Sequence, residues 1–268
     1  MLFAVRHETH YRYSVPVVLA PHILRLTPRA EHRLLSRTLV VRPEPVELRD
    51  EIDAFGNATT RVVFPETSTG ELFIASSFEL ETTLAAPPPA PAEILRAYHA
   101  GGASVDEGVA AFGRVLLAEA GHDLLPFLDH LCRTVHGRAD KHVRPTGDAQ
   151  SAAETLATWR GACRDFTVLF LAVVRSLGLA ARFCSGYQAK ADTPDGRRYL
   201  HAWPEVFVPG VGWRGWDPTH GIPVTDGHVA LCAAPDQAGT MPVVGSYSFI
   251  GPSLTSTLDF DLRIRTTR

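Results

Sequence analysis

The sequence lacks a strong charge bias. Its 26 Lys and Arg residues nearly balance 29 Asp and Glu residues, which leaves a formal net charge of −3 at pH 7. Proteins that hold nucleic acid or an anionic membrane surface through charge carry a basic surplus instead. We therefore expect neither nucleic acid nor a membrane as the main partner.

Cysteine is also scarce, and no two cysteines have the C-x-x-C spacing of a zinc ribbon or a redox pair. The 268 residues contain four cysteines, namely Cys132, Cys163, Cys184 and Cys232. So few cysteines favour reduced thiols and a cytoplasmic location. No stretch approaches the ~18 apolar residues of a membrane helix, and the residues after Met1 lack the apolar segment of a signal peptide. The sequence predicts no cofactor and no resident metal.

The sequence does contain enough apolar material for a large core. Hydrophobic residues make up 45% of the chain and charged residues 21%, which is typical of a globular protein. A single low-complexity stretch, rich in proline, predicts an extended linker at 86–92. We expect this linker to separate a sandwich-like β domain at 1–85 from a catalytic core at 93–235, which a β tail at 236–268 follows.

The hydrophobic periodicity changes at this linker. Before it, polar and apolar residues alternate from residue 3 to residue 13, and further strands are expected at 22–27, 35–42, 44–53, 58–65 and 71–83. After it, the pattern predicts helices over 92–99, 105–119, 123–137, 151–158 and 163–178, then strands over 180–190, 199–208 and 212–217. Helices that precede an antiparallel sheet indicate an α+β fold in which the helices pack on the sheet. The last residues alternate again, and this strand could join either sheet.

Cys163 stands at the predicted start of the most apolar helix. Gly161 and Ala162 precede it, and such small residues let a substrate approach the sulfur. A helix N-terminus offers unpaired N–H groups and the positive end of the helix dipole, and both stabilise a thiolate. Upstream, Ser151 and Glu154 have the spacing of a capping box, which predicts a short helix before this one. Cys163 is therefore the candidate nucleophile, and the other three cysteines are expected to be buried and inert.

A histidine and an aspartate follow in a segment that favours a β-hairpin. His201 begins an alternating run, residues 209–212 are turn-forming, and Asp217 ends the second run. If the turn is centred on Pro209, the numbers of paired residues sum to 418 and His201 lies opposite Asp217. Opposed side chains have Cβ atoms ~4.5–5.5 Å apart, which is within reach of a hydrogen bond. A thiol, an imidazole and a carboxylate in this order predict a catalytic triad of Cys163, His201 and Asp217.

Five short segments around these residues form a longer pattern. They read Gly161-Ala-Cys-Arg-Asp-Phe166, Leu177-Gly-Leu-Ala-Ala-Arg182, Ser185-Gly-Tyr187, His201-Ala-Trp-Pro-Glu205 and Gly212-Trp-Arg-Gly-Trp-Asp-Pro-Thr219. In this order they resemble the bacterial transglutaminase-like superfamily. Three earlier segments resemble the β-rich N-terminal region that precedes this core in one bacterial branch: Arg6-His-Glu-Thr-His-Tyr-Arg-Tyr13, Leu24-Arg-Leu-Thr-Pro28 and Asp53-Ala-Phe-Gly-Asn57. The resemblance implies an antiparallel β domain followed by a papain-like, transglutaminase-like core, and the activity of a cysteine peptidase.

The predicted triad indicates a cysteine-dependent hydrolase or acyl transferase that acts on amide bonds, with a peptide or protein as substrate. The thiol attacks the carbonyl to form a thioester acyl-enzyme, which either water or an amine then resolves. Water gives a peptidase or amidase, whereas an amine gives a transglutaminase that forms isopeptide bonds. The segment 189–198 is polar and rich in turn residues, so it predicts an open cleft and favours hydrolysis.

Two other classes of function stay open. The fold could serve as a non-catalytic module that binds a peptide by strand addition to its β domain. Alternatively, Cys163, His201, Asp217 and His220 have the side chains of a metal site.

Two further residues are candidates for the substrate site. Trp203, two residues after His201, is expected to contact the acyl substrate. An oxyanion needs two hydrogen-bond donors. The backbone N–H of Cys163 is the first candidate, and Gln150 is a candidate for the second by residue type alone.

Overall fold

The structure is a computed structural model that describes residues 1–83, 92–99, 106–144, 146–189, 193 and 196–267. The chain forms two compact units. We call them the β unit, which comprises Met1–Thr83, Gln188–Tyr199 and Met241–Arg268, and the core unit, which comprises Leu84–Tyr187 and Leu200–Thr240. All of the predicted linker except Ala92 lies outside the described residues.

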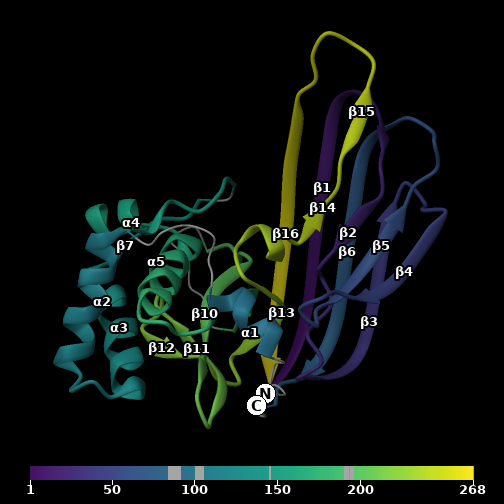
Figure 1. The fold of residues 1–268 in the computed structure, drawn as a ribbon. Helices are drawn as coiled ribbons and strands as arrows, with labels where there is room; N and C mark the ends of the chain where they lie inside the picture. Colours follow the sequence, from purple (N-terminus) through teal and green to yellow (C-terminus); the bar gives the residue numbers. More distant parts are fainter. Residues whose placement is uncertain (84–91, 100–105, 145, 190–192, 194–195, 268) are drawn as a thin grey trace. The chain divides into compact units, whose positions relative to one another are not determined.

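The β unit consists of two antiparallel sheets (Figure 1). The first has the order β15-β1-β6-β3, with β16 also paired to β1, and the second has the order β14-β2-β5-β4. Their strands are β1 (Leu2–Leu19), β2 (His22–Leu24), β3 (Arg33–Arg42), β4 (Glu47–Ile52), β5 (Ala58–Val63), β6 (Thr69–Glu81), β14 (Val243–Val244), β15 (Tyr247–Phe249) and β16 (Ser256–Thr267). One cluster of buried side chains draws on both sheets, among them Leu24, Val62 and Ile74. The β unit is thus built of antiparallel sheets that share a buried cluster, and it includes residues beyond the 1–85 range expected from the sequence.

The C-terminal strand joins the N-terminal sheet. β16 runs antiparallel to β1 from the pair Leu2 and Thr267 to the pair Tyr13 and Ser256. β1 alternates between buried and exposed or half-buried residues along much of its length, whereas β16 buries Leu262 and leaves most of its other residues exposed. Tertiary pairing thus decides a choice that the sequence had left open.

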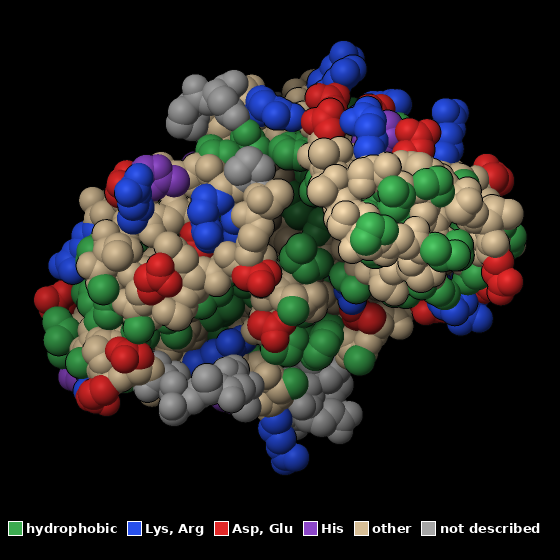
Figure 2. All heavy atoms as spheres, turned by 90° about the horizontal axis from the view of Figure 1, so that it is seen from above, with side chains coloured by type: hydrophobic (Ala, Val, Ile, Leu, Met, Phe, Trp, Pro, Cys, Tyr) green, Lys and Arg blue, Asp and Glu red, His purple; other side chains and the backbone are tan. Residues whose placement is uncertain are grey.

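One connecting segment of the β unit is uncharged. Residues 246–257, which include β15 and the turn into β16, contain no Asp, Glu, Lys or Arg. Seen end-on in Figure 2, this segment presents hydrophobic and uncharged polar side chains, and Tyr247, Phe249 and Ile250 are exposed there.

The core unit packs helices on an antiparallel sheet. Its helices are α1 (Ala92–His99), α2 (Glu107–Glu119), α3 (Leu124–Arg138), α4 (Ala152–Thr158) and α5 (Cys163–Ser176), with a short 3₁₀ turn η1 (Ala238–Thr240). The sheet has the order β12-β11-β10-β9-β13. Its strands are β9 (Ala181–Gln188), β10 (His201–Val208), β11 (Gly212–Asp217), β12 (Ile222–Pro223) and β13 (His228–Ala234). A two-stranded parallel pair, β7 (Asp140–Lys141) and β8 (Arg160–Gly161), lies just before α5.

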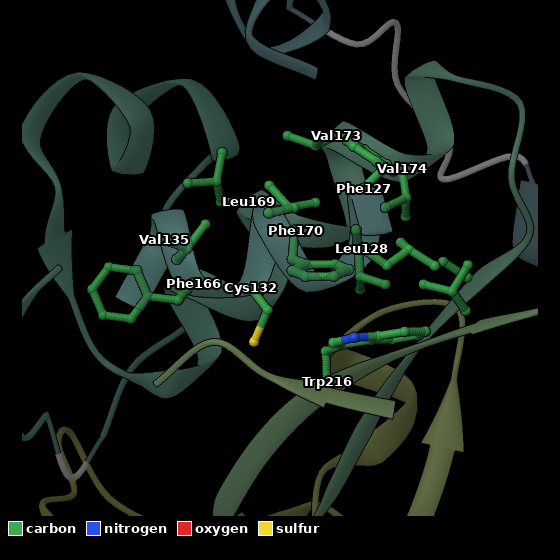
Figure 3. Close-up of a cluster of buried hydrophobic side chains, with 14 of the residues drawn as sticks. Phe127, Leu128, Cys132, Val135, Phe166, Leu169, Phe170, Val173, Val174 and Trp216 are labelled. Atoms are coloured by element: carbon green, nitrogen blue, oxygen red, sulfur yellow. The ribbon is translucent and has the colours of Figure 1, made fainter. Parts of the chain in front are cut away.

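The apolar face of α5 is the centre of the core. Figure 3 shows side chains of α5, including Phe166 and Phe170, in one cluster with side chains of α3 such as Phe127 and with Trp216, whose ring lies beside Phe170. Trp216 stacks on Phe170 with 6.4 Å between the ring centroids, and its Nε1 donates to Asp129 at 2.8 Å. Burial of this helix against the sheet holds its N-terminal residue, the candidate nucleophile, beside the strands. Within the described residues, no helix has the length and apolarity to cross a bilayer.

Substitution of Gly186 tests the close packing of the sheet. A Cβ at this residue of β9 would lie 2.0 Å from the carbonyl oxygen of Val229 and 2.7 Å from the ring of Trp203. We expect Gly186→Ala to lower the free energy of unfolding by about 3 kcal/mol, because backbone or indole must move. Gly137→Ala in α3 is the control. There a Cβ meets no described heavy atom within 4 Å, so the substitution is expected to stabilise the protein by up to about 1 kcal/mol. Urea unfolding measures both, and equal stabilities would contradict the packing.

Candidate active site

Cys163 is the first residue of α5, as predicted, and its side chain is half-buried. Ala162, just before the helix, has extended backbone angles, and the helix therefore begins with the cysteine. The other three cysteines are buried, as expected. Cys163 is thus the cysteine whose sulfur is partly accessible to solvent and which also lies at a helix N-terminus.

His201 and Asp217 form a buried hydrogen bond. The Nε2 atom of His201, the first residue of β10, lies 2.8 Å from Oδ2 of Asp217, the last residue of β11. Burial alone raises the pKa of Asp217. The charge of His201, together with the hydrogen bonds that the carboxylate of Asp217 accepts, outweighs this effect and holds that pKa well below its usual range. The carboxylate is therefore an acceptor, and Nε2 of His201 carries the hydrogen. The Nδ1 atom is left to face the thiol.

The thiol and the imidazole stabilise each other in their charged forms. Burial by itself raises the pKa of Cys163, but the hydrogen bond and charge of His201, with smaller effects of Ala202 and Arg164, lower it below its ordinary value. Burial likewise lowers the pKa of His201, but Asp217 and then Cys163 outweigh it and raise that pKa. The arrangement favours a thiolate and imidazolium pair, the reactive form of a cysteine nucleophile.

Two segments of the chain match known protein families. Residues 119–218 match the transglutaminase-like superfamily, and residues 3–81 match the bacterial transglutaminase-like N-terminal region. The chain belongs to the transglutaminase-like superfamily. All three predicted triad residues fall inside the transglutaminase-like match.

The chain is also similar to relatives of comparable length and to one solved structure. An uncharacterized protein of Mycobacterium leprae is 29% identical over 98% of both chains. Another, from Mycobacterium tuberculosis, is 26% identical over 91% of this chain and 86% of its own. The crystal structure of a protein from Cytophaga hutchinsonii, proposed to be a cysteine protease, has a TM-score of 0.71 at 20% identity and covers 100% of this chain and 92% of its own. At that identity the likeness shows the fold, and the predicted α+β, transglutaminase-like fold is confirmed.

The predicted register of the hairpin formed by β10 and β11 is wrong by two residues. β10 pairs with β11 so that Glu205 lies opposite Gly215, and the numbers of paired residues sum to 420. The turn is centred one residue later than predicted, at Gly210, whose φ of +76° suits glycine. Because a shift by two keeps each side chain on its face, His201 and Asp217 still share a face and meet diagonally rather than directly opposite.

Two further histidines bind the same carboxylate. His220 Nδ1 lies 2.7 Å and His228 Nε2 3.1 Å from Oδ2 of Asp217. Backbone N–H groups of Thr219 and His220 donate to the other oxygen. Burial lowers the pKa of His228, so this ring is a neutral donor. Sequence reasoning missed His228, because it starts β13, a strand that is not adjacent to β11.

The cluster of His201, Asp217 and His220 has the donor atoms of a metal site. Its nitrogen-to-oxygen distances of 2.7 and 2.8 Å match direct hydrogen bonds. Two ligands on one tetrahedral zinc, each ~2.0–2.1 Å from the ion, would lie roughly 3.3 Å apart. Cys163, the fourth ligand of the alternative prediction, is not part of this cluster. The observed geometry therefore suits a hydrogen-bonded triad better than a metal centre.

Trp203 is fully buried behind His201. Its ring centroid is 6.1 Å from that of His201 and 5.3 Å from that of His228. In this structure the indole supports the imidazoles, and its role in substrate binding stays a prediction. The side chain of Gln150 donates to Glu154 in α4 at 3.3 Å, so here it contacts the helix.

Selective alkylation tests the assignment of the nucleophile. With limiting iodoacetamide at pH 7, we expect Cys163 to react at least about tenfold faster than the other cysteines, because its thiolate is stabilised and accessible. Burial raises the pKa of Cys132, for example, to about 12. Peptide mapping by mass spectrometry gives the labelling of each residue. Protein unfolded in urea is the control, since all four thiols should then react alike. Even labelling of the folded protein would remove Cys163 as the nucleophile.

Proposed function

We propose that this transglutaminase-like protein is a cysteine-dependent hydrolase or acyl transferase of peptide or protein amides, with Cys163, His201 and Asp217 as its triad. The observation that carries the proposal is the position of His201. One nitrogen is held by a fully buried carboxylate at 2.8 Å, and the ring hydrogen-bonds the half-buried thiol at a helix N-terminus. These are the roles of nucleophile, base and orienting group in acyl transfer.

In the first step, the thiolate of Cys163 attacks the carbonyl carbon of an amide. The backbone N–H of Cys163 at the N-terminus of α5 is positioned to stabilise the oxyanion. As the C–N bond breaks, His201 gives its Nδ1 proton to the leaving amine and becomes neutral. The products are a free amine and a thioester between the acyl group and the sulfur.

In the second step, neutral His201 takes a proton from the acyl acceptor. The acceptor attacks the thioester carbon, the C–S bond breaks, and the thiolate and imidazolium pair forms again. Water as acceptor yields a carboxylic acid, and an amine yields a new amide. Asp217 keeps its charge throughout and orients His201.

The cellular setting is part of the proposal and rests on the sequence. The near balance of charges supports a peptide or protein substrate over nucleic acid or a membrane, and the scarcity of cysteine supports a cytoplasmic location. No cofactor takes part in the proposed steps.

Substitution of the triad separates the three roles. We expect Cys163→Ala and His201→Ala each to reduce kcat/KM by on the order of 10⁴-fold or more, because both groups act in the bond-making steps. Asp217→Asn should retain measurable activity, since Asp217 orients the imidazole and favours its charged form but makes no bond to the substrate. Activity is followed on a peptide library by mass spectrometry, with far-UV circular dichroism to confirm folding. Cys232→Ala, which removes a buried thiol outside the triad, is the control. Full activity in His201→Ala would exclude this mechanism.

Competition between water and an amine decides the reaction type. We expect hydrolysis to exceed amine transfer for a simple peptide amide, because the polar segment 189–198 predicts an open cleft, although much of it lies outside the described residues. Incubation with peptide and excess primary amine, read by mass spectrometry, measures both products. A dominant amine adduct would instead assign the protein as a transglutaminase. Binding of peptide without any acyl adduct on Cys163 would assign a non-catalytic module.

A further inference from the structure

A second buried carboxylate lies two residues after the nucleophile. Asp165, in the first turn of α5, is fully buried, and its carboxylate accepts hydrogen bonds from the backbone N–H groups of Ala162 at 2.6 Å and Gln150 at 2.7 Å. The fit is tight, because a Cβ at Gly161 would lie 2.7 Å from Cβ of Asp165. Asp165 thus fastens the residue before Cys163, and the chain that leads into α4, to the start of the helix.

This carboxylate competes with the nucleophile for positive potential. A helix N-terminus stabilises one nearby anion through its free N–H groups and dipole. Here a thiolate at Cys163 and a carboxylate at Asp165 share the same terminus. Like charges at this range destabilise each other, most strongly where water is excluded. An uncompensated Asp165 would therefore suppress the thiolate form of Cys163.

Arg144 supplies the compensating charge. Its Nη2 atom lies 2.6 Å and 2.8 Å from the two oxygens of Asp165, and about one third of its side chain is exposed. Arg164, next to the nucleophile, donates to the carbonyl groups of Arg144 and Thr146 at 2.8 Å and 2.7 Å. Arg164 thus holds the backbone segment that carries Arg144.

We propose that Arg144 is a positioning residue of the triad, which neutralises buried Asp165 so that Cys163 can ionise at the same helix N-terminus. The carboxylate shapes the backbone around the thiol, and the guanidinium cancels its charge. The proposal rests on the proposed function, because it concerns the reactive form of the nucleophile.

Within the part of the chain that the structure describes, other charged groups also act at this end of α5. His201 of β10 and Arg164 of α5 both favour the thiolate. Asp148, on the segment before α4, acts on Arg164 together with Arg144, Cys163 and Asp165. Among the described groups that interact with this end of α5, Arg144 is the cation with a direct contact to Asp165. Removal of the Arg144 charge therefore affects the electrostatic surroundings of Asp165 more than it affects those of His201.

The test is the pH dependence of Cys163 alkylation in the full chain. The rate with iodoacetamide is measured from pH 4 to 10 by mass spectrometry of the Cys163 peptide, which needs no substrate. In Arg144→Gln we expect the apparent pKa of the thiol to rise by about one unit, so that the rate falls on the order of tenfold in the pH range below the wild-type pKa. Arg144→Lys, which keeps the charge but not the two-oxygen contact, should fall between this variant and the wild type.

Two variants separate charge from structure. Arg160→Gln removes an arginine that precedes the same helix, but its side chain is 66% exposed and contacts Asp140, so the rate should change less than about twofold. Arg144→Gln combined with Asp165→Asn removes both charges, although Asn keeps only one of the two acceptor oxygens, and should move the pH profile from that of Arg144→Gln back toward that of the wild type. A purely structural role of Arg144 would lower the thermal midpoint without moving the profile.

The outcomes are distinct. A folded Arg144→Gln protein with the wild-type pH profile overturns the proposal. If that single variant does not fold, the double variant is compared with Asp165→Asn alone: equal pH profiles support the proposal, because Arg144 then has no carboxylate charge to neutralise, and a thiol pKa that is higher in the double variant overturns it. Failure of the proposed function looks different, because Cys163 of the wild-type protein would then show no selective reaction below pH 7.

Discussion

The organisation of the candidate site depends on the burial of one ionised carboxylate. Asp217 is fully buried, and removal of a carboxylate from water costs several kcal/mol unless donors replace the solvent. Three imidazoles and two backbone N–H groups do so here. The imidazoles come from the start of β10, the turn after β11 and the start of β13. Parts of the sheet that are distant in sequence must therefore meet at Asp217, and the orientation of His201 follows from that requirement.

The candidate nucleophile meets a related constraint at the N-terminus of α5. The apolar face of this helix is packed against the sheet, so its N-terminal turn is held beside His201. That turn carries two acidic groups, Cys163 and Asp165, and two arginines offset them. The site thus places several charges in a region with little water, where each one needs a partner. Substitution of any member is expected to change the ionisation of the others, because electrostatic effects are long-ranged at low dielectric.

Local sequence patterns predicted much of this. The helix start at Cys163, the hairpin with His201 and Asp217, and the order of helices before strands follow from periodicity, turn residues and small residues near the thiol. The error of two residues in the hairpin register arose because turn geometry depends on which glycine adopts a positive φ. It left the predicted pair intact, since the side-chain period of a strand is two.

The sequence by itself determined which chemical groups are present and which face or helix end each occupies, because these properties depend on neighbours within a few residues. Tertiary structure alone decided that β16 pairs with β1, that His228 reaches Asp217 from a non-adjacent strand, and that Arg144 contacts Asp165. These contacts join residues 11 to 265 positions apart. No local pattern encodes them, because they form only when packing of the apolar faces brings separate elements together.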